Sequence, residues 1–255
     1  MNFTPKKPLL IMACVLVLAI SSIAAPTTND TTAIQREVEQ VMTDSRKQME
    51  ALSSSFESKD ESVQREAAKK YQAIRKDAAD KYLALSKKDP KDPGAVEALV
   101  MVLFSARGSD VAKQALEILK SDYLKSPHIT GLCLYLEHDQ TEGQQVLEKI
   151  VDSNPNPVPK AGALLALGRI AKHRDPEKAE TYFEEITTKY PNAKYEIFGR
   201  KMNFGEEARN ELFEIQHLGI GKQAPEISGE DIDGKKFTLS DYRGKVVLLD
   251  FWGDW

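Results

Sequence analysis

The stretch ALLALGRIAKHRDPEKAETYFEEITTKYP, residues 163–191, decides the fold. Its second half places a small residue, Ala179, four positions before a bulky one, Phe183, and it ends on Pro191. A small side chain lets two helices approach closely, and a bulky side chain one turn later fills the groove on the same face. Proline ends a helix because it lacks an N–H group and clashes with the preceding turn. The pattern therefore predicts the second helix of a packed helical hairpin.

The same spacing of a small residue, a bulky apolar residue and a proline occurs three times earlier in the chain. These copies are Ala78, Tyr82 and Pro90; Ala115, Leu119 and Pro127; and Gly143, Leu147 and Pro155. Ahead of them, residues 31–86 predict two amphipathic helices, with apolar positions in the second at steps of three and four residues. The segment SSSFESKD, residues 53–60, is typical of the turn between two such helices. We therefore expect helical hairpins that stack on one another.

The copy quoted first resembles a tetratricopeptide repeat, since Leu167-Gly168 stand in its first helix and Ala179 and Phe183 in its second. Its loop is one residue shorter than the family pattern, and the other copies are more degenerate. The resemblance implies a surface for a protein partner on the repeats.

We interpret the chain as mainly α, with an amphipathic helical hairpin over residues 31–88 and tetratricopeptide-like repeats over residues 89–215. An unrelated helical bundle is the alternative fold. Mixed charges fill the outer faces of the predicted helices, which indicates solvated surfaces rather than a binding patch.

The first 25 residues, MNFTPKKPLLIMACVLVLAISSIAA, carry two lysines near their start, Lys6 and Lys7, then an apolar run over residues 9–20, and they end in small side chains. This pattern predicts a secretory signal peptide, residues 1–24, that is cleaved after Ala24. A lipoprotein lipidated at Cys14 and an uncleaved anchor are the alternatives. Cleavage would leave Cys133 as the single thiol of a protein outside the cytoplasm, with no membrane contact beyond the signal peptide.

The composition excludes several classes of function. The net charge is −4 and charged residues make up 29% of the chain, which argues against binding to nucleic acid because phosphates require a basic face. The four histidines are scattered, no C-x-x-C spacing occurs, and neither of the usual glycine-rich phosphate loops is present. We therefore expect no metal and no cofactor.

The last 37 residues, 219–255, change from helical periodicity to strands and turns. IGKQAPEISG, residues 220–229, predicts a loop that leads into a short strand. Asp233-Gly234 then predicts a turn before a second strand over Lys236 to Leu239. SDYRGK, residues 240–245, is typical of a capped turn. VVLLDF, residues 246–251, is a continuous apolar run of the kind found in a central strand covered on both faces.

This ordered pattern resembles the opening of a redoxin domain. It runs from the A-P of residues 224–225 through DGKKFTLSDYRGK to VVLLDFWGDW. It is similar to the thioredoxin-like AhpC/TSA and TlpA-type proteins that bacteria export. The resemblance implies that residues 219–255 form the N-terminal fragment of an α/β thioredoxin-like domain in the bacterial periplasm or cell envelope. In that family the next residues are C-x-x-C at the start of a helix.

The resemblance also implies roles for residues at the end of the chain. A thiolate stabilised at a helix N-terminus attacks a substrate disulfide, and a second cysteine resolves the mixed disulfide. Asp250 corresponds to a buried acid/base that handles the proton of the resolving thiol, although a solvent-facing residue at a strand end is the alternative. Trp252, Gly253, Asp254 and Trp255 flank the active site, and simple packing is the alternative for the tryptophans.

The sequence thus predicts an exported thiol–disulfide oxidoreductase, truncated one residue before its expected C-x-x-C and inactive as it stands. Its partners would be protein disulfides or thiols and a redox donor. The alternatives are a helical-repeat adaptor with a vestigial redoxin tail and a peroxidase of the peroxiredoxin type. A selenocysteine codon after Trp255, a nonsense mutation and a contig edge each account for the stop.

Overall fold

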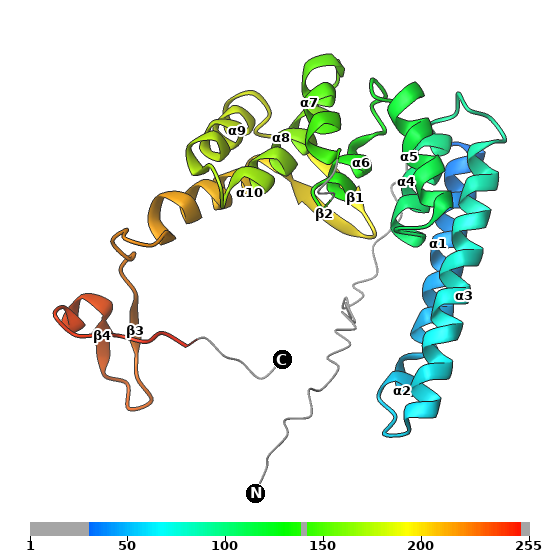
Figure 1. Cartoon of the computed structure of the whole chain (residues 1–255). Coiled ribbons are helices and arrows are strands. Elements are labelled where there is room, and N and C mark those ends of the chain that lie inside the picture. The colour runs from blue at the N-terminus through cyan, green and yellow to red at the C-terminus, as the bar shows by residue number, and fades with distance from the viewer. Residues whose placement is uncertain (1–30, 139–141, 251–255) are drawn as a thin grey trace, which may run out of the picture. The chain divides into compact units, whose positions relative to one another are not determined.

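The computed structural model describes residues 31–138 and 142–250. These residues are mainly helical, as predicted, and their strands form two separate two-stranded antiparallel sheets (Figure 1). The α-helices are α1 (Ala33–Glu50), α2 (Ser53–Phe56), α3 (Glu61–Ser86), α4 (Pro93–Ser105), α5 (Asp110–Asp122), α6 (Thr130–Leu136), α7 (Gly143–Ser153), α8 (Pro157–Ala171), α9 (Pro176–Lys189) and α10 (Phe204–Phe213). A π-helical turn, η1 (Glu214–Leu218), continues α10.

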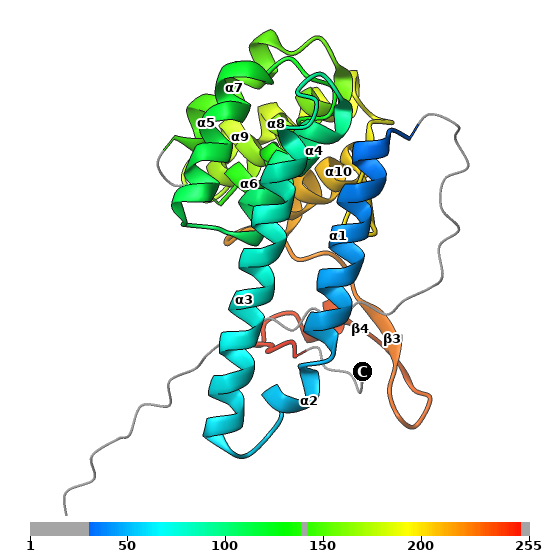
Figure 2. The same ribbon diagram turned by 90° about the vertical axis from the view of Figure 1, so that its right-hand side faces the viewer.

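The first structural unit of the helical body is the predicted hairpin of two amphipathic helices. The long helices α1 and α3 lie side by side, and the short helix α2 lies in the turn between them (Figure 2). Thr32 begins α1 with a capping box: the Gln35 backbone N–H donates to Thr32 Oγ1 at 3.1 Å, and the Thr32 N–H donates to Gln35 Oε1 at 3.0 Å. Asp60 caps α3 by accepting from the Ser62 N–H at 2.8 Å.

The helices after α3 pack in consecutive pairs, α4 with α5, α6 with α7 and α8 with α9. The first helices of neighbouring pairs also contact each other, since α6 packs against both α4 and α8, and α8 packs against α10. This is the contact pattern of stacked helical hairpins, in which each pair touches its neighbours along the chain.

The small and bulky residues of the predicted spacing are all buried. They are Ala78, Tyr82, Ala115, Leu119, Gly143, Leu147, Ala179 and Phe183. In the last pair, a Cβ atom added to Gly168 of α8 would lie 2.3 Å from Cε1 of Phe183 in α9. The ring therefore packs directly on the backbone of α8, which is why a small residue stands at position 168.

The prolines of the spacing end the helices less directly than predicted. α7 and α9 end two residues before Pro155 and Pro191, so the proline there stops the helix. α3 and α5 end well before Pro90 and Pro127, and short turns follow both helices. At these two positions the proline follows a helix that has already ended.

A β-hairpin interrupts the array that the sequence predicted to be entirely helical. Strand β1 (Lys194–Ile197) pairs with β2 (Arg200–Asn203), joined by a two-residue turn of Phe198 and Gly199. Both turn residues have positive φ, +54° and +76°, as the tight turns of hairpins require. The prediction of helical repeats over residues 89–215 is therefore wrong for this segment.

The buried side chains of the described residues form two clusters. One joins α1 and α3–α8, and the other joins α8, α9, β2 and α10, with Ile215 at its edge. Asn203 caps α10, which η1 continues, by accepting from the Gly205 N–H at 3.1 Å. Neither cluster includes a residue after Ile215.

Among the described residues, no helix combines the length and the apolar character needed to cross a membrane. The predicted signal peptide lies outside these residues and stays a prediction.

Candidate functional site

The segment with the redoxin-like pattern contains a second β-hairpin. Strand β3 (Ser228–Glu230) pairs antiparallel with β4 (Lys236–Thr238), with Gly229 opposite Phe237. The ring of Phe237 lies close over Gly229, since a Cβ atom added there would be 3.1 Å from the ring. Both strands lie where the sequence placed them.

The connection between the two strands is a loop organised by Asp231. Its Oδ1 accepts from the N–H groups of Asp233 at 3.0 Å and Lys235 at 2.9 Å. Gly234 has a φ of +76° and donates its N–H to the Asp231 carbonyl at 2.9 Å. This confirms the predicted turn at Asp233-Gly234, and the glycine supplies the left-handed backbone that the turn requires.

After β4 the chain enters a short 3₁₀ helix, η2 (Leu239–Tyr242), which is the predicted capped turn. Asp241 Oδ2 accepts from the Thr238 N–H at 2.9 Å, and Glu226 Oε1 accepts from the Ser240 N–H at 3.0 Å. Hydrogen bonds from Ser240 lower the pKa of Glu226, and hydrogen bonds from Thr238 lower the pKa of Asp241. Both carboxylates thus stabilise the turn in their ionised form.

This turn should loosen as the solution is acidified. Because the folded pKa values of Glu226 and Asp241 are depressed, their contribution is present above the ordinary carboxyl pKa and is lost as the pH falls through the depressed values. We expect the amide proton shifts of Ser240 and Thr238, followed by NMR, to titrate below the usual carboxyl range. Glu226→Gln should abolish the Ser240 transition alone. A midpoint at the ordinary glutamate value would contradict this assignment.

The predicted central strand does not form within the described residues. Residues 246–250 have no regular secondary structure and pair with no described strand, and Val246 and Leu248 are 103% and 92% exposed. Asp250 is exposed as well, so the buried environment expected for it is absent here. A continuous apolar strand is stable only between flanking strands and under covering helices, and the described residues supply neither. The role of Asp250 as an acid/base stays a prediction.

Trp252, Gly253, Asp254 and Trp255, the expected active-site flank, lie outside the described residues. The structure therefore brings none of the expected site residues together. Local hydrogen bonds form the β3–β4 hairpin and η2. Residues 246–250, which follow them, are exposed, and residues 251–255 are not described.

Cys133 is the one cysteine among the described residues, and it lies in α6. Its side chain is fully buried, and Sγ donates to the carbonyl oxygen of Pro159 at 3.7 Å. Burial raises the pKa of the Cys133 thiol to about 12. A thiol held protonated in an apolar interior is a poor nucleophile, so the structure favours a structural role for Cys133.

The folded chain should therefore react slowly with thiol reagents. We expect Ellman's reagent to modify Cys133 at least about a hundredfold more slowly in the native protein than in denaturant, because only the unfolded chain exposes a thiolate. The 255-residue chain should also fail to reduce insulin disulfides. Insulin reduction that disappears in Cys133→Ser would overturn both expectations.

A cluster of ion pairs joins α8 to α10 and η1. Arg169 contacts Glu207 through Nη2 at 2.8 Å and Glu211 through Nε at 2.7 Å. Lys172 contacts Glu211 at 2.8 Å and Glu214 at 2.6 Å. Burial opposes ionisation of Glu211, but the hydrogen bonds from Lys172 and Arg169 outweigh it and hold the pKa of Glu211 below its usual value. The cluster fixes α10 and η1 against the end of α8.

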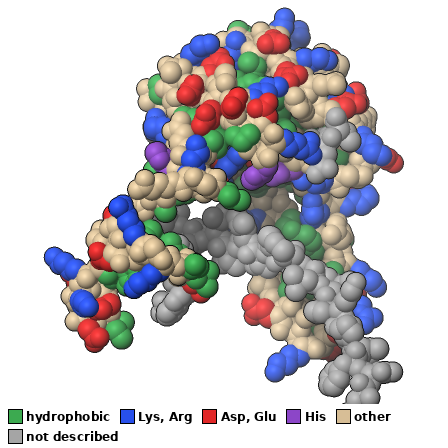
Figure 3. All heavy atoms as spheres, turned by 60° about the vertical axis from the view of Figure 1, so that its left-hand side comes forward, with side chains coloured by type: hydrophobic (Ala, Val, Ile, Leu, Met, Phe, Trp, Pro, Cys, Tyr) green, Lys and Arg blue, Asp and Glu red, His purple; other side chains and the backbone are tan. Residues whose placement is uncertain are grey.

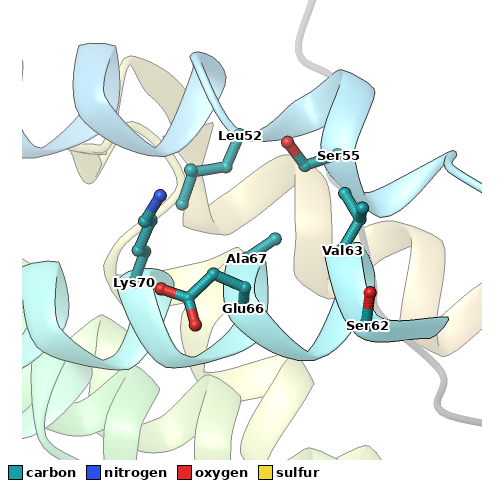
Figure 4. A pocket seen from close by; sticks show the side chains of 7 residues that line it. All are labelled: Leu52, Ser55, Ser62, Val63, Glu66, Ala67 and Lys70. Carbon is teal, nitrogen blue, oxygen red and sulfur yellow. The ribbon is translucent and has the colours of Figure 1, made fainter. Parts of the chain in front are cut away.

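Elsewhere, no catalytic constellation stands out on the surface of the described residues. Charged side chains of both signs are interspersed over the face shown in Figure 3. A hollow of about 260 Å3 lies between the turn after α1 and one face of α3, with Leu52, Val63 and Ala67 on its walls (Figure 4). Its charged groups are Glu66 and Lys70, and it contains neither a nucleophile beside a base nor a pair of carboxylates. No group of acidic, histidine and cysteine side chains in residues 31–138 and 142–250 is suited to hold a metal ion.

The comparison with protein families identifies the repeat. A tetratricopeptide repeat model matches residues 162–193, which comprise most of α8, all of α9 and the turn that follows. The match covers the copy in which the ring of Phe183 packs on Gly168.

Curated relatives are similar over one short stretch. The chain is 48% identical over 40 residues to the thiol-disulfide oxidoreductase ResA of Bacillus thuringiensis subsp. konkukian, which covers 16% of this chain and 23% of the relative. It is 51% identical over 40 residues to ResA of Bacillus subtilis, covering 16% and 22%. ResA of Geobacillus thermodenitrificans is 45% identical over 38 residues, covering 15% and 22%. The chain thus spans less than a quarter of the relatives it matches, and no solved structure matches it.

Proposed function

We propose that the chain is the N-terminal part of an exported, thioredoxin-like thiol–disulfide oxidoreductase in which helical repeats precede the redox unit. The observation that carries the proposal is the identity of 45% to 51% with ResA proteins over 38 to 40 residues. We infer that this stretch is the redoxin-like pattern of residues 219–255, because its length is similar and no other segment of the chain resembles a redoxin.

Disulfide exchange requires an accessible thiolate, and neither cysteine of these 255 residues fits that role. Cys133 is buried with a raised pKa, and Cys14 belongs to the proposed signal peptide. The proposal therefore places the exchanging pair outside this sequence, after Trp255. Asp250 would accept and return the proton of the resolving thiol, and the tryptophans would shield the site.

The proposed organisation is a signal peptide over residues 1–24, a helical hairpin over 31–88, helical repeats interrupted by the β1–β2 hairpin over 89–215, and the redoxin segment over 219–255. Repeat arrays present extended surfaces to other proteins, which supports a protein partner for the helical body. The ion pairs of Lys172 with Glu211 of α10 and Glu214 of η1 hold these two elements in place just before the redoxin segment begins.

A helical-repeat adaptor without enzymatic activity is the second candidate function. It is favoured by the one specific observation that the 255 residues contain no C-x-x-C and only one described, buried cysteine. The tetratricopeptide match is consistent with either function.

Insulin reduction by the protein encoded by the complete gene separates the two candidates. We expect dithiothreitol-coupled precipitation of insulin to be accelerated by that protein and not by residues 25–255 alone. Mutation of the first exchanging residue to serine should abolish the acceleration. A complete gene product that reduces no disulfide would support the adaptor.

Removal of residues 219–255 should improve solubility without weakening the helical body. Both clusters of buried side chains end by Ile215, whereas Val246 and Leu248 are almost fully exposed and present an aggregation hazard. We expect an unchanged helical circular dichroism signal per helical residue and a higher soluble yield. Loss of cooperative melting in the truncated protein would show that the segment packs on the repeats.

A further inference from the structure

Three aromatic rings from distant parts of the sequence meet at one place on the helical body. Phe104, at the end of α4, packs edge-on against Tyr135 of α6, with ring centroids 5.8 Å apart. It also packs edge-on against Phe198 in the turn of the β1–β2 hairpin, at 5.2 Å. None of the three is fully buried, and Phe198 is 38% exposed. They form a partly exposed aromatic surface built from α4, α6 and the turn, in which Phe104 and Tyr135 also pack against the core.

The backbone of Phe198 is strained. It is the one residue other than glycine with a positive φ among the described residues, at +54°. A bulky side chain there is disfavoured, and asparagine or glycine is the usual choice for the first position of such a turn. Strain of this kind persists where the surrounding structure or a function requires the side chain. The hairpin therefore retains a phenylalanine at a position where the backbone alone would favour another residue.

Two guanidinium groups border the aromatic surface. Cζ of Arg107, an exposed residue, lies 4.8 Å from the ring centroid of Tyr135. Arg75 of α3 donates to the carbonyl oxygens of Phe104 at 2.9 Å and Ser105 at 3.0 Å, which caps the end of α4. Within residues 31–138 and 142–250, neither arginine has a carboxylate within ion-pair distance. The exposed guanidinium of Arg107 therefore remains available to an outside anion, whereas Arg75 is half-buried and is held by the two carbonyl oxygens.

We propose that Phe104, Arg107, Tyr135 and Phe198 form a docking site for an extended, acidic segment of a partner protein that carries aromatic side chains. The rings offer edges and faces to the partner's apolar side chains, and Arg107 lies beside them to pair with a carboxylate. Aromatic residues and arginine dominate the binding energy of protein interfaces when they stand together. Complementarity of charge selects an acidic segment over a basic one.

Fluorescence anisotropy with two labelled peptides tests this proposal. One peptide repeats glutamate, serine and phenylalanine, and the other has lysine in place of glutamate. We expect residues 25–255 to bind the acidic peptide and not the basic one, with an affinity that falls as salt is added. Arg107→Glu should weaken binding about tenfold or more. Lys178→Glu is the matched control, since Lys178 also lies over a tyrosine ring, at 5.7 Å from Tyr182. It should change the affinity by less than about twofold.

Phe198→Asn distinguishes recognition from packing. Asparagine suits the positive φ, so the melting temperature should stay the same or rise while the acidic peptide binds about tenfold more weakly. A lower melting temperature with unchanged affinity would show that Phe198 serves the fold alone, and it would overturn the proposal. Equal binding of both peptides, or no binding of the acidic one to the unaltered protein, would overturn it as well.

Discussion

Replacement of Phe183 by alanine is expected to lower the free energy of unfolding of the helical body by about 3–5 kcal/mol. The ring is fully buried between α8 and α9, and it fills the space left by the missing side chain of Gly168. Because that space lies against the backbone of α8, the surrounding helices cannot collapse far enough to refill it. Urea denaturation followed by helical circular dichroism measures the change.

Thr181→Ala on the same helix is the control for this substitution. Thr181 is exposed, and its hydroxyl donates to the Glu177 carbonyl at 3.1 Å within the helix. Its replacement should change the free energy of unfolding by less than about 0.5 kcal/mol. A loss below about 1 kcal/mol for Phe183→Ala would contradict close packing of α8 on α9.

Arg169→Ala should lower the free energy of unfolding by about 2–4 kcal/mol, because it removes the cation that three partly buried carboxylates share, those of Glu137, Glu207 and Glu211. The side chains of Arg169 and Glu211 are only 23% and 14% exposed, so solvent screens their interaction weakly. The depressed pKa of Glu211 stabilises the fold above the ordinary glutamate pKa, and this contribution is lost as the pH falls through the folded pKa. The difference in free energy of unfolding between the Arg169→Ala variant and the unaltered protein should therefore shrink in acid.

The matched control is Arg65→Ala. Arg65 pairs with Glu61 at 2.8 Å, but the two side chains are 75% and 80% exposed. An ion pair in such a setting contributes little, and the substitution should change the free energy of unfolding by less than about 0.5 kcal/mol. Equal effects of Arg65→Ala and Arg169→Ala would show that the cluster between α8 and α10 does not stabilise the fold.

Periodic apolar spacing predicted the helices well, because the residues that define it are the ones the helices bury. The packing of Ala179 and Phe183 between helices could be predicted from their spacing in the sequence, and both side chains are fully buried. The Asp233-Gly234 turn and the strand that begins at Lys236 were also predictable, since local hydrogen bonds and a positive φ decide them.

Features that depend on distant contacts were not predictable. The β1–β2 hairpin lies where the repeats suggested helix, and its turn places a phenylalanine where asparagine or glycine is usual, so the turn signal was missing. Strand pairing over VVLLD depends on neighbours that the described residues do not contain, and Asp250 is exposed as a result. The aromatic surface joins Phe104, Tyr135 and Phe198 across some ninety positions of sequence, and no local pattern reveals it.

The nucleotide sequence that follows the Trp255 codon tests the central claim most directly. The proposed function predicts codons for a redox pair, Cys-x-x-Cys. It also predicts on the order of 100 further codons with alternating strands and helices, enough to complete a thioredoxin-like domain. A gene with neither such a pair nor redoxin-like coding after the Trp255 codon would contradict the proposed function.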